Sequence, residues 1–177
     1  MIDDKDKVLL GSATPDYYGG FYNRFEYKGF ALDMNFVFSV GNDAYNAVRR
    51  TLESVSDFSN QSKAVVRRWT MEGQVTDIPR AEWGDAIGNN AFSDRWIEDA
   101  SYVKLRDITL SYTFDKPIFN FLQSGTVYIT GQNLLTLTNY LGMDPEFSYS
   151  YSDALQGFDY AKVAQPKTIK IGVNLKF

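Results

Sequence analysis

The last ten residues, TIKIGVNLKF (Thr168–Phe177), decide the fold class of this 177-residue chain. Apolar residues occupy every second position, and threonine, lysine, glycine and asparagine fill the positions between them. Such alternation predicts a β-strand with one apolar and one polar face. The apolar positions are Ile169, Ile171, Val173, Leu175 and Phe177.

The same alternation occurs in FALDMNFVFSV (Phe30–Val40), which follows FYNRFEY (Phe21–Tyr27) after a Lys-Gly corner. The two segments predict a β-hairpin. The 11 residues of the second segment match the length of about 9–11 residues of a tilted transmembrane strand. Its apolar positions are Phe30, Leu32, Met34, Phe36, Phe38 and Val40.

Two further strands are predicted, over Ser101–Phe114 and Thr126–Leu137. In the first of these, Val103 and Leu105 are out of phase with the apolar residues that follow them. A β-bulge near Arg106 would correct the phase.

The predicted connections alternate between short and long. The short ones are the Lys-Gly corner and residues 115–125, and the long ones are residues 41–100 and 138–166, with short helices expected in NDAYNAVRRTLESV and KAVVRRW. Short turns at one end and long loops at the other are typical of an up-and-down meander in an outer-membrane barrel. Loops of this length would be unusual in a compact soluble domain.

The composition excludes several classes of protein. No apolar segment approaches the ~18 residues of a membrane-spanning helix. The formal net charge of −4, with both signs interspersed, gives no basic surface for nucleic acid. The chain has no cysteine and no histidine, which removes thiol nucleophiles, histidine-based triads and Cys/His zinc sites.

We therefore expect no enzyme and no catalytic, cofactor-binding or metal-binding residues. The acidic neighbours Asp144 with Glu146 and Glu98 with Asp99 resemble the two carboxylates of a glycosidase. Since the chain holds 22 acidic residues, we interpret these pairs as chance neighbours on solvated surface. No spacing typical of an EF-hand supports a calcium site.

The opening MIDDKDKVLLGS lacks the basic and apolar regions of a secretory signal.

Six motifs in order resemble the carboxyl-terminal part of the SusC/RagA family of TonB-linked outer-membrane transporters, also called TonB-dependent transporters. The resemblance extends from about Gly11 to Phe177. The motifs are PDYYGGFYNRFEYKGFAL, GNDAYN, DIPR, SDRWIEDASYVKLRDITLSYTF, TVYITGQNLLTLTNYLGMDPE and TIKIGVNLKF.

The resemblance implies an all-β chain, an antiparallel meander that forms the last five or so strands of a transmembrane barrel of roughly 22 strands. Residues 1–17 would be a lead-in or the remnant of an extracellular loop, and residues 18–177 the barrel segment. The expected localisation is the cell outer membrane. The expected function is import of a nutrient, either a glycan or a peptide, without catalysis.

The resemblance also implies the partners. These are a SusD-like surface lipoprotein, the TonB complex through parts of the protein absent here, outer-membrane lipid, and the barrel-assembly machinery through the carboxyl-terminal strand. No nucleic acid is expected.

Three sets of residues carry the site predictions. The apolar positions Phe30, Leu32, Met34, Phe36, Phe38, Ile169, Ile171, Val173, Leu175 and Phe177 would face lipid. The polar positions Arg24, Glu26, Asp33, Asn35 and Lys170 would face a hydrated lumen. Aromatic residues of the loops, which could stack on sugar rings or contact the lipoprotein, are Trp69, Trp83, Trp96, Tyr140, Phe147, Tyr149, Tyr151, Phe158 and Tyr160.

Two alternatives remain open from the residues alone. A soluble carbohydrate-binding β-sandwich would also contain alternating strands. A small self-contained outer-membrane barrel would need at least about eight strands, and the alternation predicts five.

Overall fold

The computed structural model describes residues 4–115, 122–147 and 155–177. These residues form two compact units that interleave along the chain. The strand unit comprises Pro15–Gly41, Ser101–Asn139 and Ala164–Phe177. The loop unit comprises Met1–Thr14, Asn42–Ala100 and Tyr140–Val163.

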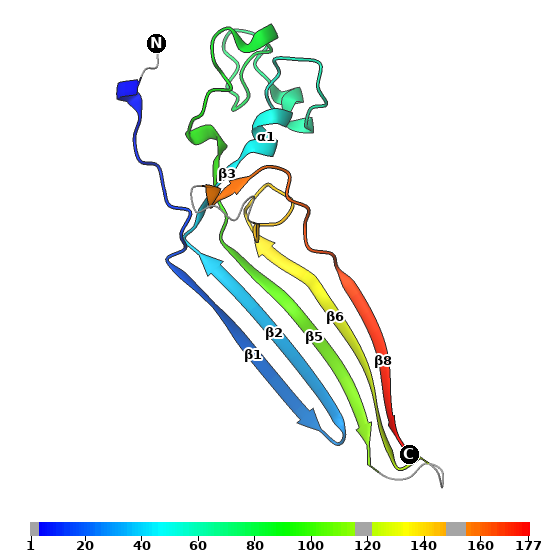
Figure 1. The fold of residues 1–177 in the computed structure, drawn as a ribbon. Helices are drawn as coiled ribbons and strands as arrows, with labels where there is room; N and C mark the ends of the chain where they lie inside the picture. Colours follow the sequence, from blue (N-terminus) through cyan, green and yellow to red (C-terminus); the bar gives the residue numbers. More distant parts are fainter. Residues whose placement is uncertain (1–3, 116–121, 148–154) are drawn as a thin grey trace. The chain divides into compact units, whose positions relative to one another are not determined.

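The strand unit is one antiparallel sheet of five strands in the order β1-β2-β5-β6-β8 (Figure 1). The predicted antiparallel all-β meander is confirmed, and its last strand, β8, pairs antiparallel with β6. The strands are β1 (Tyr17–Tyr27), β2 (Phe30–Val40), β5 (Tyr102–Phe114), β6 (Ser124–Thr138) and β8 (Thr168–Lys176).

A two-residue turn joins β1 to β2. Lys28 has φ 47° and Gly29 has φ 84°, so both central residues lie in the left-handed region. This is the type I′ turn, whose twist matches that of the flanking strands. The Gly29 carbonyl accepts a hydrogen bond of 2.8 Å from the Thr113 amide, which ties the turn to β5.

We expect Gly29→Ala to lower the free energy of unfolding of the complete transporter by about 1–3 kcal/mol. An added Cβ would lie 2.6 Å from the Thr113 carbonyl oxygen, at a backbone φ that alanine adopts only with strain. Denaturant titration in lipid vesicles measures the change. Lys28→Asn is the control, since asparagine tolerates the left-handed region. Equal stability of the two variants would contradict the turn geometry.

The predicted bulge lies at Arg106. Asn35 pairs with Asp107 and Phe36 pairs with Leu105, so the pairing skips one residue of β5. The pairing of β5 with β6 shifts at the same place. The extra residue brings the two halves of β5 into phase, because their apolar side chains now share one face of the sheet.

One face of the sheet, called the apolar face here, carries aliphatic and aromatic side chains from all five strands. Residues paired directly across antiparallel strands lie on the same face, and the register therefore defines the set. Several of these side chains are strongly exposed, with Ile171 at 75% and Phe30 at 52%. The set comprises Tyr17, Phe21, Phe25, Tyr27, Phe30, Leu32, Met34, Phe36, Phe38, Val40, Val103, Leu105, Ile108, Leu110, Tyr112, Phe114, Val127, Ile129, Leu135, Leu137, Ile169, Ile171, Val173 and Leu175.

The loop unit contains a second, smaller sheet. Its strands β3 (Asp43–Asn46), β4 (Ile97–Asp99) and β7 (Phe158–Asp159) have the order β4-β3-β7, with β3 antiparallel to β4 and parallel to β7. The alternation in the sequence did not predict this sheet, because strands of two to four residues are too short to show a period.

Helices in the loop unit are short. The α-helix α1 (Ala47–Leu52) and the 3₁₀ helix η2 (Lys63–Arg67) confirm the two helices expected from the sequence. Three further 3₁₀ turns are η1 (Asp4–Asp6), η3 (Trp83–Asp85) and η4 (Asp94–Trp96). Within the described ranges, none of these helices has the length and apolar character needed to cross a membrane.

Candidate functional site

The opposite face of the large sheet, called the polar face here, carries hydrogen-bonded rows that run across the strands. One row contains Arg24, Asp33, Thr109, Thr130 and Lys170, each directly opposite the next. The Arg24 guanidinium donates to both Asp33 carboxylate oxygens at 3.0 and 3.1 Å. The Thr109 and Thr130 hydroxyls lie 2.8 Å apart. Polar side chains of this row therefore satisfy one another within the sheet.

A neighbouring row contains Tyr22, Asn35, Asp107, Gln132 and Thr168. The Gln132 amide donates to the Asp107 carboxylate at 2.8 Å. The Tyr22 hydroxyl donates across rows to Asp33. Carboxylates, hydroxyls, amides and cations alternate on this face, which suits contact with water and with polar solutes rather than with hydrocarbon.

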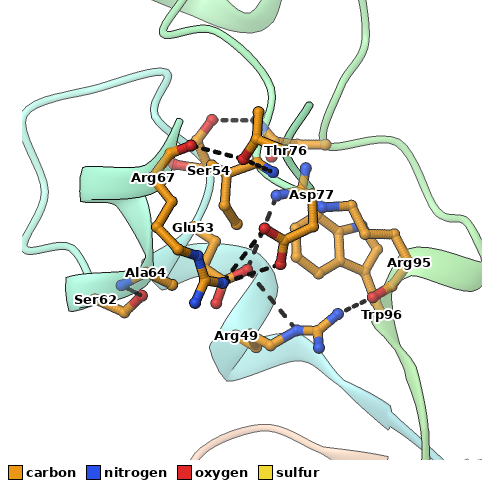
Figure 2. Close-up of polar contacts among 12 residues, drawn as sticks. Arg49, Glu53, Ser54, Ser62, Ala64, Arg67, Thr76, Asp77, Arg95 and Trp96 are labelled. Carbon is orange, nitrogen blue, oxygen red and sulfur yellow. Dashed lines mark hydrogen bonds and ion pairs between the residues drawn. The ribbon is translucent and has the colours of Figure 1, made fainter. Parts of the chain in front are cut away.

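The buried centre of the loop unit is Trp96, whose side chain has no solvent exposure. The guanidinium of Arg95 lies 4.3 Å from its ring and that of Arg49 lies 5.4 Å away, as cation–π partners (Figure 2). The indole N–H donates to the Ala91 carbonyl at 3.1 Å. Trp96 thus joins η4 to α1 and to the segment before η4.

Two carboxylates, of Glu53 and Glu98, balance the positive charges of the two arginines. Glu98 accepts from Arg49 at 3.0 Å, and Glu53 lies 3.9 Å from Arg49 and 3.8 Å from Arg95 (Figure 2). Burial lowers the pKa of the Arg95 guanidinium, and Glu53 opposes that shift. The Glu98 carboxylate also accepts a hydrogen bond from the Leu141 amide at 3.0 Å. This side chain therefore joins the two long segments of the loop unit, residues 42–100 and 140–163.

A second link between these connections is the hydrogen bond from the Tyr140 hydroxyl to Asp159, at 2.6 Å. Tyr140 is 6% exposed and Asp159 is 4% exposed. Burial, and then the Asp159 carboxylate, raise the pKa of Tyr140 above its ordinary value. The ring packs against Phe147, with centroids 5.5 Å apart.

We expect Tyr140→Phe to destabilise the loop unit by about 1–3 kcal/mol, because the change leaves a buried carboxylate oxygen without its donor. Amide hydrogen exchange of α1 and β3 in the complete transporter measures the free energy of opening. Tyr160→Phe is the matched control, since Tyr160 is 59% exposed.

The stabilisation by the Tyr140–Asp159 hydrogen bond should decrease at alkaline pH. The folded state holds the Tyr140 proton more tightly than the unfolded state, so this stabilisation is complete below the ordinary tyrosine pKa of 10.0 and is lost as the pH rises above it. Tyr140→Phe should lack this loss. A variant with the stability and alkaline response of the unmodified chain would contradict the assignment.

The candidate aromatic residues fall into two groups. Trp96, Tyr140 and Phe147 pack inside the loop unit, and Phe158 stacks on Tyr45 at 5.0 Å. Trp69 is half-buried, whereas Trp83 and Tyr160 are 68% and 59% exposed. Tyr149 and Tyr151 lie outside the described residues.

Trp83 is not alone. Its ring lies 4.6 Å from that of Phe58, which is 93% exposed. Phe58 was absent from the sequence-based candidates, because nothing in the sequence relates position 58 to position 83.

Carboxylates of the two acidic pairs make contacts within the loop unit. Glu98 is engaged by Arg49, Asn46 and the Leu141 amide, and the Asp144 carboxylate accepts from the Glu146 amide. Among residues 4–115, 122–147 and 155–177, no group of three or more acidic side chains could hold a metal ion.

An antiparallel meander with one exposed apolar face and one hydrogen-bonded polar face is the kind of sheet from which transmembrane β-barrels are built. Comparison with known proteins narrows this class. No protein-family model matches the chain. It is 33% identical to TonB-dependent receptor P3 and 34% identical to TonB-dependent receptor P26, both of Formosa agariphila, over 99% and 100% of its length.

The chain spans 18% of the length of each of these two relatives. It is also 26% identical over 99% of its length to TonB-dependent receptor SusC of Bacteroides thetaiotaomicron, of which it covers 16%. Among solved structures, the RagAB peptide importer in the closed-closed state matches 96% of the chain with a TM-score of 0.79 and 28% identity, over 18% of that structure's chain. The open-open state matches with a TM-score of 0.76.

The chain is therefore a homologue of one segment of the TonB-dependent receptors of the SusC and RagA type, which are outer-membrane proteins. This confirms the resemblance drawn from the sequence, the fold class and the localisation. The relatives are receptors and transporters rather than enzymes, in agreement with the expectation that the chain has no catalysis.

Proposed function

We propose that this chain is a barrel segment of a TonB-dependent importer of glycan or peptide nutrients that works with a SusD-like surface lipoprotein. The observation that carries the proposal is the contrast between the two faces of the five-stranded sheet. The names of the relatives, TonB-dependent receptor and peptide importer, support the direction and the energy source of transport. Contact with the TonB complex belongs to parts of such a receptor outside this sheet.

The apolar face contacts lipid in the complete barrel. Burying exposed apolar side chains in hydrocarbon removes them from water, which stabilises the inserted sheet by roughly 25 cal/mol per Å². Exposure of Ile169 at 67% and Val173 at 55% supports this role for β8. The lipid-contacting set comprises Phe30, Leu32, Met34, Phe36, Phe38, Ile169, Ile171, Val173, Leu175 and Phe177.

The polar face lines a hydrated interior. Its rows already pair Arg24 with Asp33 and join Gln132 to Asp107 by a hydrogen bond, so these polar side chains have partners within the wall. Lys170 and Glu26 extend the same surface at the edges of the sheet. A wall of this kind lets a polar solute pass without the loss of its hydrogen bonds.

The edge strands of the sheet need further binding partners in the complete barrel. On β8 one edge pairs with β6, and in the complete barrel the other edge pairs with a further strand, because unpaired backbone groups in hydrocarbon cost several kcal/mol each. The barrel-assembly machinery acts on this carboxyl-terminal strand. Residues 1–17 act as a lead-in and residues 18–177 as the barrel segment.

The test uses the complete transporter in the bacterium that encodes it. An affinity tag on the transporter should recover a surface lipoprotein from detergent-solubilised outer membranes. Deletion of the transporter gene or loss of TonB should each abolish growth on the oligomeric nutrient. Growth that needs the transporter but not TonB would overturn the proposal.

The alternatives make different predictions. A soluble β-sandwich would fractionate without the outer membrane. A self-contained barrel would import without further strands, although five strands are fewer than the roughly eight of the smallest barrels.

A further inference from the structure

The row of the apolar face nearest the β1–β2 turn is aromatic on three adjacent strands. Tyr27 pairs with Phe30, and Phe30 pairs with Tyr112. The rings of Phe30 and Tyr112 lie 4.6 Å apart, and Tyr27, Phe30 and Tyr112 are 70%, 52% and 42% exposed. Short turns lie on the periplasmic side of outer-membrane barrels, so we expect this row, at the end of the two-residue turn (Figure 1), at the periplasmic membrane interface.

A lysine ammonium lies over this aromatic row. The Lys28 Nζ is 5.1 Å from the centroid of the Tyr27 ring, which directs the side chain toward the apolar face. Within the described ranges, the Lys28 ammonium has no carboxylate partner, and the hydroxyls of Tyr27 and Tyr112 have no hydrogen-bonding partner. An ammonium has three N–H donors and a phenol has one O–H donor. Donor groups therefore border a surface that is otherwise apolar.

The turn fixes the backbone position of Lys28. Its φ of 47°, followed by the φ of 84° at Gly29, defines a type I′ turn. The Gly29 carbonyl accepts the 2.8 Å hydrogen bond from the amide of Thr113, the residue after Tyr112. The lysine and the tyrosine of β5 are thus held at the same end of the sheet before any ligand binds, which lowers the entropic cost of binding.

The other charged side chains near this end of the sheet, among the described residues, are Glu26, Lys176 and Asp115. Glu26 lies on the polar face, where Arg24 pairs with it at 2.6 Å. Lys176 follows Leu175 and lies on the polar face as well. Asp115 is exposed one residue after β5, and its charge would repel an anion. Lys28 is therefore the cation on the apolar side, with Asp115 as the opposing charge.

We propose that Lys28, Tyr27 and Tyr112 bind the phosphate group of a phospholipid in the periplasmic leaflet. The ammonium would pair with the phosphate, the phenol hydroxyls would donate to its oxygens, and the acyl chains would lie along the apolar face. Tyrosine rings suit the boundary between hydrocarbon and headgroups, and a lysine near the membrane surface attracts anionic lipid. The proposal rests on the lipid contact of the apolar face and adds a defined headgroup site to it.

Binding is measured on the purified complete transporter in a phosphate-free sugar detergent, by native mass spectrometry that counts bound lipid molecules. The probe is phosphatidylglycerol, and diacylglycerol with the same acyl chains is the probe without a phosphate. We expect Lys28→Asn to bind one phosphatidylglycerol fewer than the unmodified protein, until the lipid concentration is raised about fivefold. Asparagine tolerates the left-handed region, so the turn is kept.

Four variants control the measurement. Lys176→Asn removes the same charge from the polar face and should bind as the unmodified protein does. Lys28→Arg keeps the cation and should retain affinity within about twofold. Tyr112→Phe keeps the ring without the hydroxyl and should weaken binding about threefold. Asp115→Asn removes the repelling charge and should strengthen binding about twofold.

Equal phosphatidylglycerol binding by Lys28→Asn and the unmodified protein, or an equal loss in Lys176→Asn, would overturn the proposal. Displacement of this lipid by inorganic phosphate would show that the site takes a free anion rather than a phospholipid. Diacylglycerol bound as tightly as phosphatidylglycerol would show that the acyl chains alone are recognised. That result would overturn the headgroup site and leave the proposed function standing, because import needs the lipid contact of the barrel but no phosphate site.

Discussion

Met34→Arg in the complete transporter is expected to lower the free energy of folding into lipid by about 2–4 kcal/mol if the residue lies near the bilayer midplane. Met34 is the central apolar residue of β2 and pairs with Ile108 and Asn23 on the apolar face. An arginine there would have to leave its charge in hydrocarbon or reach toward the headgroups. Denaturant titration of the folded barrel in vesicles measures the difference.

Asn35→Arg is the matched variant, one residue further on the same strand. Asn35 pairs with Asp107 and Tyr22 on the polar face, so the new guanidinium would meet water and a carboxylate. We expect a much smaller loss than at Met34. Equal losses at the two positions, or the reverse order, would contradict the assignment of the faces to lipid and lumen.

The large sheet was predictable from the sequence because its signal is local. Alternation along β2 and β8 is visible in 11 and 9 consecutive residues, and each strand reveals its own two faces. The bulge at Arg106 followed from the parity of Val103 and Leu105 alone. The Lys-Gly corner predicted the hairpin because this signal is also local: a two-residue turn depends on adjacent positions.

The interior of the loop unit was not predictable, because its contacts join distant positions. Arg49 and Arg95 meet on Trp96 although 46 positions separate the two arginines. No period or motif relates them. The same holds for Tyr140 with Asp159, so aromatic residues that the sequence offered as ligand contacts include several that hold the loop unit together.

The strand unit was easier to predict than the loop unit because the surroundings of the two units differ. In the strand unit, the proposed contact of one face with lipid and of the other with water would require an apolar and a polar residue in turn, and the sequence has this alternation. In the loop unit, no uniform solvent imposes a period, and single buried groups such as Trp96 and Glu98 organise the fold. The strand unit should therefore tolerate changes that keep the alternation, whereas the loop unit should be sensitive at a few positions.

Trp96→Ala is expected to destabilise the loop unit by about 3–5 kcal/mol, the usual cost of deleting a large buried aromatic side chain. The ring is fully buried, and its loss would leave a cavity and two arginines without their cation–π surface. Amide hydrogen exchange of α1 and β3 in the complete transporter should rise to nearly unprotected rates. The strands of the large sheet should keep their protection.

Trp83→Ala is the matched tryptophan control, because its ring is 68% exposed and little buried surface would be lost. It should leave the exchange of α1 and β3 unchanged, whereas Trp96→Ala should raise that exchange. If Trp83→Ala unfolded the loop unit as strongly as Trp96→Ala, burial of the ring would not set the cost of its deletion. If Trp96→Ala left exchange unchanged, the network of Arg49, Arg95 and Glu53 would not be the core of the unit.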